Sequence, residues 1–209
     1  EKQNYQTLQA DVVVETSAGI SGQKIVQEYR YFVKRPDRMK MEIFKPFRQT
    51  VVMKDGVVSI KMPDGKIQKH KISELPGMGN IQTQRLYSIE YIKEQYDISK
   101  IHDYVKEEKT YIEIKLVPKS ESVLPTMIME IEKLTCLVEK QKVLNEEEII
   151  MSESINRKIE NINGIFVPSI IEGYTVSHKK PQTIQFKSKM FYNNIKINQK
   201  IDENEFAIK

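Results

Sequence analysis

The chain has 209 residues, a mean hydropathy of −0.50, and a formal net charge of +4 from 33 basic and 29 acidic residues. Both signs of charge are spread along the sequence, and no zinc-finger, RRM or basic-helix signature occurs, which argues against nucleic acid as a partner. No run of 18 apolar residues occurs, so the sequence predicts no membrane-spanning helix. The length suits one domain or at most two, and we expect a single domain over residues 1–209.

The first third of the chain predicts an antiparallel meander. Apolar and charged residues alternate from residue 38 onward, so Met39, Met41 and Ile43 are expected on one face of a strand. Asp55-Gly56 stands between two apolar runs and predicts a two-residue type I′ turn, because both central residues of that turn need a positive φ. The expected strands are 5–16, 24–34, 38–44, 49–54 and 57–62, with a short return at 66–72.

A helical insert interrupts this pattern. Residues 73–80 include Gly77 and Gly79 and suit a flexible connection. Leu86, Ile89 and Ile92 then recur at roughly helical spacing, which predicts a helix over 83–96. We expect the whole insert at about residues 73–98. Its spacing fits a movable lid and a static core helix equally well.

Strand patterns resume after the insert. They are expected at 98–105, 110–117, 126–133, 136–144, 148–155, 165–177 and 183–193, followed by a tail from 195 to 206. In total, about ten or eleven strands at spacings of about 8–12 residues, plus one helix, are typical of a mainly β protein. A large open antiparallel sheet curls because strand twist accumulates, so we expect an unclosed, strongly curved half-barrel with one concave apolar face.

The residues that usually carry chemistry do not converge in this sequence. His70, His102 and His178 lie on separate predicted elements without ligand spacing, so we expect neither a metal site nor any other cofactor. No nucleophile elbow, P-loop or dinucleotide fingerprint occurs. Cys136, the single cysteine, is expected as a buried small side chain in a strand. The sequence therefore favours a protein that is not an enzyme.

Several short segments, taken in order, carry a resemblance to a known family. They are Tyr31–Arg38 with Lys40 and Glu42, Pro46, Asp55-Gly56, Leu116-Val117-Pro118, Asn163–Pro168, and Asn194–Asn198 with Ile201, Asp202 and Phe206. With these segments the chain resembles the LolA/LolB-type outer-membrane lipoprotein-sorting proteins over nearly its whole length. The resemblance implies an unclosed antiparallel half-barrel of about eleven strands, with a helical lid over a hydrophobic cavity.

The sequence departs from this family in two respects. The family usually begins with a helix before its first strand, whereas here a strand is expected from residue 5, so we expect part of the lid to be missing or trimmed. The aromatic lining common in carriers is also thinner, because the chain has no Trp and uses Met, Val and Ile instead.

The resemblance implies a function in lipid handling. Such proteins hold acyl chains and carry lipoproteins across the periplasm, or receive them at a membrane. We therefore expect binding of lipid or lipoprotein acyl chains, a membrane-bound donor or acceptor protein, peripheral membrane contact and a monomeric state. The expected location is extracytoplasmic, in the periplasm or at the outer face of the cell membrane, with a signal segment or lipid anchor lost before Glu1. The alternative is an envelope sensor domain on the same fold that acts through protein contacts.

The candidate binding residues are apolar side chains expected on one sheet face or on the insert helix. Methionine suits flexible acyl chains because it is unbranched and polarizable, although an ordinary sheet core would give the same pattern. The predicted lining residues are Val12, Val14, Tyr29, Tyr31, Val33, Met39, Met41, Ile43, Met53, Ile60, Met62, Leu86, Ile89, Ile114, Met127 and Met129.

The family also has a functional arginine just before the proline that follows its second strand. It maps onto Arg35, and the resemblance implies that this residue helps to hold the lid closed. The alternative is a solvent-facing arginine, or a turn over residues 35–38 with a local ion pair of little energetic value.

Overall fold

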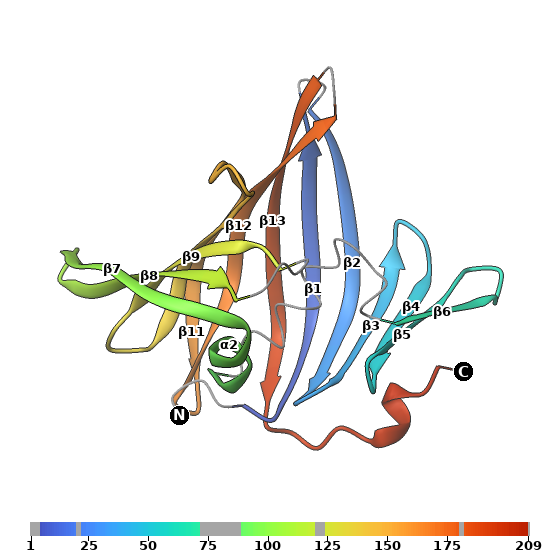
Figure 1. Ribbon diagram of the computed structural model, residues 1–209. Helices are drawn as coiled ribbons and strands as arrows, with labels where there is room; N and C mark the ends of the chain where they lie inside the picture. Colours follow the sequence, from blue (N-terminus) through green and yellow to red (C-terminus); the bar gives the residue numbers. More distant parts are fainter. Residues whose placement is uncertain (1–4, 20–21, 72–88, 120–123, 180–181, 209) are drawn as a thin grey trace. The chain divides into compact units, whose positions relative to one another are not determined.

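A computed structural model describes residues 5–19, 22–71, 89–119, 124–179 and 182–208 (Figure 1). Within these residues the chain forms one unclosed, mostly antiparallel sheet, with the strand order β6-β5-β4-β3-β2-β1-β13-β12-β11-β10-β9-β8-β7. The strands are β1 (Thr7–Ala18), β2 (Gln23–Lys34), β3 (Arg38–Lys45), β4 (Gln49–Lys54), β5 (Val57–Lys61), β6 (Ile67–Lys71), β7 (Tyr96–Lys106), β8 (Lys109–Pro118), β9 (Thr126–Glu132), β10 (Leu137–Leu144), β11 (Ile150–Ile162), β12 (Ile165–Lys179) and β13 (Gln182–Ile197). The described helices are α2 (Ile89–Gln95) and the short 3-10 helix η2 (Glu203–Phe206).

The chain consists of two compact units. Unit 1 comprises Glu1–Gln3, Thr16–Lys24 and Tyr87–Met190, and it contains α2 and β7 to β12. Unit 2 comprises Asn4–Glu15, Ile25–Leu86 and Phe191–Lys209, and it contains β3 to β6, η2 and most of β1 and β2. The expectation of a single domain stays a prediction.

The predicted meander is confirmed in unit 2. Strands β2 to β6 pair in sequence order with antiparallel registers, in which Tyr31 lies opposite Met41 and Met41 opposite Val51. Asp55 and Gly56 have φ values of 51° and 77°, as the expected type I′ turn requires. Local alternation and turn chemistry were therefore sufficient to predict this part of the sheet.

The strand count and the tail differ from the expectation. The described residues contain thirteen strands, whereas about eleven were expected. The predicted tail from residue 195 is also wrong at its start, because β13 continues to Ile197 before the chain turns at Asn198. Beyond it, Asp202 caps η2 by accepting a hydrogen bond from the backbone N–H of Asn204 at 2.8 Å.

Most of the predicted helical insert lies outside the described residues. Within them, α2 covers only Ile89–Gln95, and β7 begins at Tyr96, where the helix was still expected. The helical lid therefore stays a prediction. No helix among the described residues is long and apolar enough to span a membrane.

The expectation of a buried Cys136 in a strand is wrong. Cys136 is exposed and has a φ of 58°, because it lies in the turn between β9 and β10. The buried carboxylate of Glu132 builds this turn by accepting hydrogen bonds from the backbone N–H groups of Leu134 at 2.8 Å and Thr135 at 2.7 Å. A side chain that caps a turn in this way competes with strand formation.

Candidate functional site

One face of unit 2 is apolar across four strands. Since directly opposed residues of neighbouring strands point to the same side of a sheet, the registers group the side chains into rows. One row joins Tyr31, Met41, Val51 and Ile60. We call this surface the tyrosine–methionine face, and it consists of Tyr29, Tyr31, Val33, Met39, Met41, Ile43, Gln49, Val51, Met53, Val58 and Ile60.

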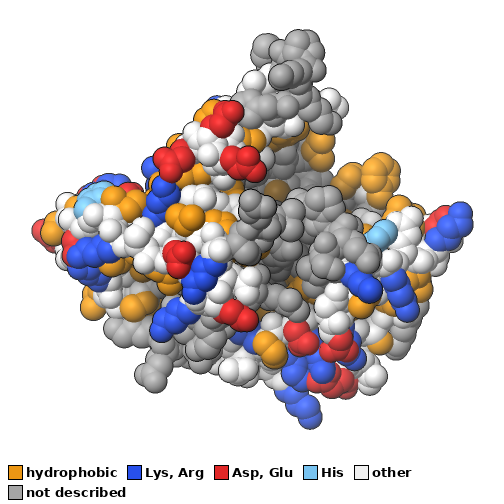
Figure 2. All heavy atoms as spheres, viewed as in Figure 1, with side chains coloured by type: hydrophobic (Ala, Val, Ile, Leu, Met, Phe, Trp, Pro, Cys, Tyr) orange, Lys and Arg blue, Asp and Glu red, His pale blue; other side chains and the backbone are white. Residues whose placement is uncertain are grey.

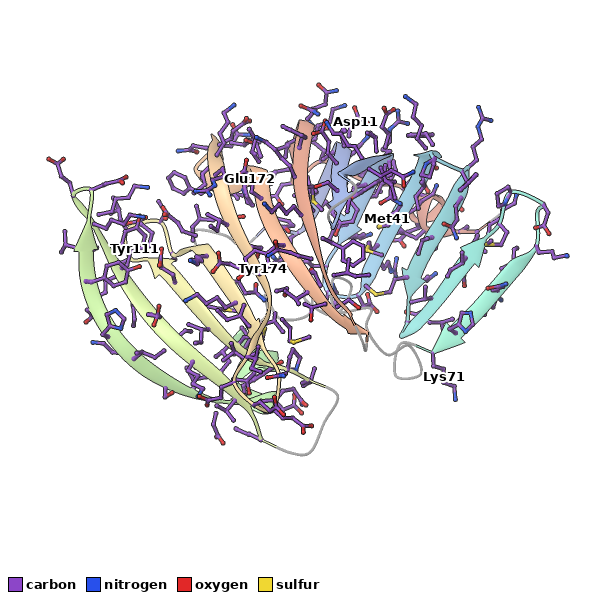
Figure 3. All side chains as sticks on the ribbon, turned by 90° about the horizontal axis from the view of Figure 1, so that it is seen from above. Asp11, Met41, Lys71, Tyr111, Glu172 and Tyr174 are labelled. Atoms are coloured by element: carbon purple, nitrogen blue, oxygen red, sulfur yellow. The ribbon has the colours of Figure 1, made fainter. Side chains whose placement is uncertain are left out.

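Exposure differs along the tyrosine–methionine face. Met39, Met53 and Val58 retain at most 3% of their exposure and form its buried part. Met41 and Ile60, in the neighbouring row, are only half-buried. In Figure 3, Met41 lies on the side of the unit 2 strands opposite Asp11. Met41 and Ile60 are therefore the partly exposed positions of this row, whereas Tyr31 and Val51 in the same row are buried.

Tyrosines give this face a few polar groups. The rings of Tyr29 and Tyr31 meet edge to face with centroids 6.2 Å apart, and those of Tyr31 and Tyr192 with centroids 6.5 Å apart. Burial raises the pKa of Tyr29 to about 12, so its hydroxyl keeps its proton at neutral pH. The Nε2 of Gln49 lies 3.5 Å from the Sδ of Met62, which is a weak acceptor.

The opposite face of unit 2 is covered by the C-terminal segment. Phe206 and Ile201 pack against Phe32 and Val52 in one buried cluster, with Ile208 at its margin. The C-terminal segment therefore covers the part of this face around Phe32 and Val52 and occupies it with the chain's own side chains.

Ion pairs border this buried cluster. Glu203 pairs with Lys34 and Arg38, and Figure 2 shows acidic and basic side chains intermixed over the region of η2. Lys40 Nζ lies 2.7 Å from Glu42 and 3.2 Å from Glu205. Burial alone would lower the pKa of Lys40, but these two carboxylates outweigh it and raise the pKa.

Arg35 contacts the beginning of unit 2. Its guanidinium carbon lies 4.3 Å from the ring centroid of Tyr5, and its backbone N–H donates to the carbonyl of Gln6 at 2.9 Å. A local ion pair within residues 35–38 was one of the alternatives for this turn. Arg38 instead pairs with Glu203, which lies outside the turn. A latch to residues 72–88 lies outside the described residues, so that role of Arg35 stays a prediction.

Unit 1 carries a second apolar face. Leu116 lies opposite Met127, and both side chains are fully buried. Ile114 lies opposite Met129 in the next row and is half-buried. The Nε2 of Gln141 lies 3.3 Å from the Sδ of Met127, which repeats the amide–thioether contact of unit 2.

The other face of unit 1 carries an aromatic and acidic row that sequence reasoning missed. The rings of Tyr104 and Tyr111 stack with centroids 5.3 Å apart, and Tyr111 Oη donates to Glu139 at 2.8 Å. Burial, with the neighbouring Glu130 and Glu139, raises the pKa of both tyrosines. His102 stacks on Tyr104, and no acidic, His or Cys cluster suited to a metal ion occurs in the described residues.

The predicted lining residues fall into two groups. Those from Val12 to Met62 belong to unit 2, and Ile114, Met127 and Met129 belong to unit 1. Leu86 lies outside the described residues, and Ile89 begins α2. Sequence reasoning missed Gln49, Val51 and Val58, although the same two-residue alternation that selected Met53 and Ile60 includes them.

The hairpin tip between β3 and β4 is a further feature that sequence reasoning missed. Phe47 is 73% exposed and Phe44 is 47% exposed. Arg48 follows Phe47 directly, and Lys45, which precedes it by two residues, pairs with Glu28 at 2.8 Å. Two exposed aromatic side chains close together in one hairpin form a small apolar patch beside basic residues. Their signal in the sequence is the short run Phe44 to Arg48, which is both apolar and basic.

Solved structures share this arrangement of strands along almost the whole chain. A LolA superfamily protein from Nitrosomonas europaea matches with a TM-score of 0.74 and 16% identity, covering 100% of this chain and 93% of that one. A DUF1329 family protein from Desulfovibrio piger matches with a TM-score of 0.76 and 10% identity, covering 99% and 91%. The chain has the LolA-like fold. The resemblance inferred from short sequence segments is thereby confirmed as a resemblance of fold.

A third solved structure supports the LolA-like fold. It is a domain assigned to outer membrane lipoprotein sorting from Vibrio parahaemolyticus, with a TM-score of 0.76 and 10% identity, covering 98% of this chain and 91% of that one. No family model matches the sequence, and a search by sequence finds no similar curated protein. At these identities the LolA-like fold is established, and the ligand must be argued from the residues.

Proposed function

We propose that this protein binds lipid or lipoprotein acyl chains without chemical conversion and transfers them outside the cytoplasm, as in outer-membrane lipoprotein sorting. The observation that carries the proposal is the tyrosine–methionine face, an apolar surface on which Met41 and Ile60 are partly exposed. Burying each methylene of an acyl chain contributes about 0.8 kcal/mol. A long chain can therefore outweigh an association cost of about 4–15 kcal/mol.

The exposed hairpin tip supports contact with a membrane surface during this transfer. Phe47 can enter the interfacial region of a bilayer, while Lys45 and Arg48 remain near anionic headgroups. A protein that exchanges acyl chains with a bilayer needs such a peripheral contact.

The experiment that tests the proposal is native mass spectrometry of the protein before and after delipidation. We expect co-purified lipid on the wild-type protein and its loss from a Met41→Lys variant. A charge at position 41 of the tyrosine–methionine face makes binding of methylenes unfavourable. Ile67→Lys is the matched control, since Ile67 is 44% exposed and lies on the opposite face of the same unit. Circular dichroism shows whether both variants remain folded. A bare chain mass, together with no binding of a fluorescent acyl probe, contradicts the proposal.

An interaction domain that acts through protein contacts is the second candidate. One observation favours it: β7 ends the strand order, and it exposes Ile98, Ile101 and Val105 by 43%, 45% and 70%. An exposed edge strand can accept a strand from another protein. Ile101→Lys should then abolish partner binding and leave acyl-chain binding unchanged, which separates the two functions.

A further inference from the structure

The tyrosine–methionine face lacks formal charge in strands β2 to β6. At its described positions these strands place apolar residues, tyrosines, Gln49, Gln68 and the imidazole of His70. The lysines, arginines and glutamates of the same strands alternate onto the opposite face, where Lys40 pairs with Glu42 and Glu205. A carboxylate that leaves water for this face meets no lysine or arginine side chain of strands β2 to β6, and burying an unpaired charge is costly.

The same face offers neutral hydrogen-bond donors. Tyr29, Ile43 and Gln49 share one row, so the Cα atoms of Tyr29 and Gln49 lie two strand spacings apart, roughly 10 Å. The amide of Gln49 donates to the thioether of Met62, a weak acceptor that a better one can replace. Such donors within an apolar surface typically fix the orientation of a ligand and its specificity.

Hydrogen-bond donors that are uncharged, on a face where strands β2 to β6 place no lysine or arginine, suit a ligand whose acceptor group is also uncharged. We infer that the tyrosine–methionine face selects acyl chains that carry an uncharged carbonyl, as an ester or amide does, over free fatty acids. In this arrangement the methylenes lie along Met41 and Ile60, and the carbonyl accepts a hydrogen bond from Gln49 or Tyr29. This inference rests on the proposed function and specifies the ligand class of the same face.

A competition assay with the delipidated full chain tests this selectivity. A fluorescent acyl probe is displaced either by a long-chain fatty acid or by its methyl ester, at a pH where the acid is ionised and below micelle formation. We expect the ester to bind at least about tenfold more tightly, because the carboxylate must leave water without a cation to compensate its charge. Equal or tighter binding of the acid overturns the inference. Binding of neither ligand instead overturns the proposed function.

Two glutamine variants test whether the preference for the ester over the acid comes from Gln49 in unit 2. Gln49→Leu should weaken ester binding by about threefold to tenfold, and should leave an alkyl probe without a carbonyl unaffected. Gln141→Leu is the matched control, because Gln141 makes the same amide–thioether contact in unit 1. An unchanged ester affinity in Gln49→Leu, or an equal loss in Gln141→Leu, overturns the assignment to unit 2.

The ester carbonyl can belong to a glycerolipid or to the acylated N-terminus of a lipoprotein. Diacylglycerol and a synthetic diacylated lipopeptide, used as separate competitors, distinguish these two sources. Displacement by either one supports the inference and identifies the source. Failure of both, while the probe itself binds, contradicts it.

Discussion

The guanidinium carbon of Arg35 lies 4.3 Å from the ring centroid of Tyr5, and the backbone N–H of Arg35 donates to the carbonyl of Gln6, the next residue after Tyr5, at 2.9 Å. This contact holds the start of unit 2 against the end of β2. A cation–π pair at a partly exposed site contributes about 0.5–1 kcal/mol, with more where the pair is desolvated.

We predict an energetic coupling between Arg35 and Tyr5. In a double-mutant cycle with Arg35→Leu and Tyr5→Leu, the coupling energy in the free energy of unfolding should be about 0.5–1 kcal/mol. Urea denaturation of the four proteins measures it. A coupling energy of zero would show that the contact contributes nothing. Slower lipid release in Arg35→Leu but not in Tyr5→Leu would point to the latch role.

The C-terminal segment should contribute strongly to the stability of unit 2. Phe206 is 2% exposed and packs on Phe32 and Val52, so Phe206→Ala should lower the free energy of unfolding by about 3–5 kcal/mol. Urea denaturation gives this value directly. Phe47→Ala is the control, since Phe47 is 73% exposed and its loss should change stability by no more than about 0.5 kcal/mol. Similar losses in both variants would contradict the packing described for Phe206.

The turn after β9 should make stability sensitive to acid. Burial acts to raise the pKa of Glu132, but hydrogen bonds from Thr135 and Leu134 outweigh it, and the pKa lies below its ordinary value of 4.5. A carboxyl whose pKa is lower in the folded state contributes stability above its unfolded pKa and loses it as the pH falls through the folded pKa. Glu132→Gln should therefore destabilise the protein at neutral pH and flatten the dependence of stability on pH below about 4.5. Parallel pH dependences of the two proteins would exclude this contribution.

The hairpin tip should anchor the protein to anionic bilayers. Phe47→Ser should weaken binding to vesicles of phosphatidylglycerol and phosphatidylethanolamine by about tenfold or more, because burial of a phenylalanine contributes about 1.5–3 kcal/mol. Vesicle co-sedimentation measures the affinity, and added salt should weaken it through Lys45 and Arg48. Leu134→Ser serves as control, because Leu134 is 74% exposed and belongs to a turn of unit 1 and not to this hairpin. If Leu134→Ser is equally impaired, the contact is not specific to the tip.

Local sequence signals determined much of this protein. The alternation through Met39, Met41 and Ile43 correctly predicted which side chains share a face, because the side-chain period of a strand is two residues. The Asp55-Gly56 turn was equally predictable, because its φ values depend on those two residues alone.

Other features were decided only by tertiary structure. The sequence shows two faces for β3 and β4. Only the fold shows that Phe206 covers part of the face with Phe32, while Met41 on the other face stays partly exposed. Cys136 is exposed because it lies in a turn in which the backbone N–H of Thr135 donates to the carboxylate of Glu132. The alternation of apolar and polar residues did not predict this turn. The predicted lining residues also separate into two units, which no local pattern signals. Strand alternation depends on neighbours in sequence, whereas the covering of a face depends on contacts between residues more than a hundred positions apart.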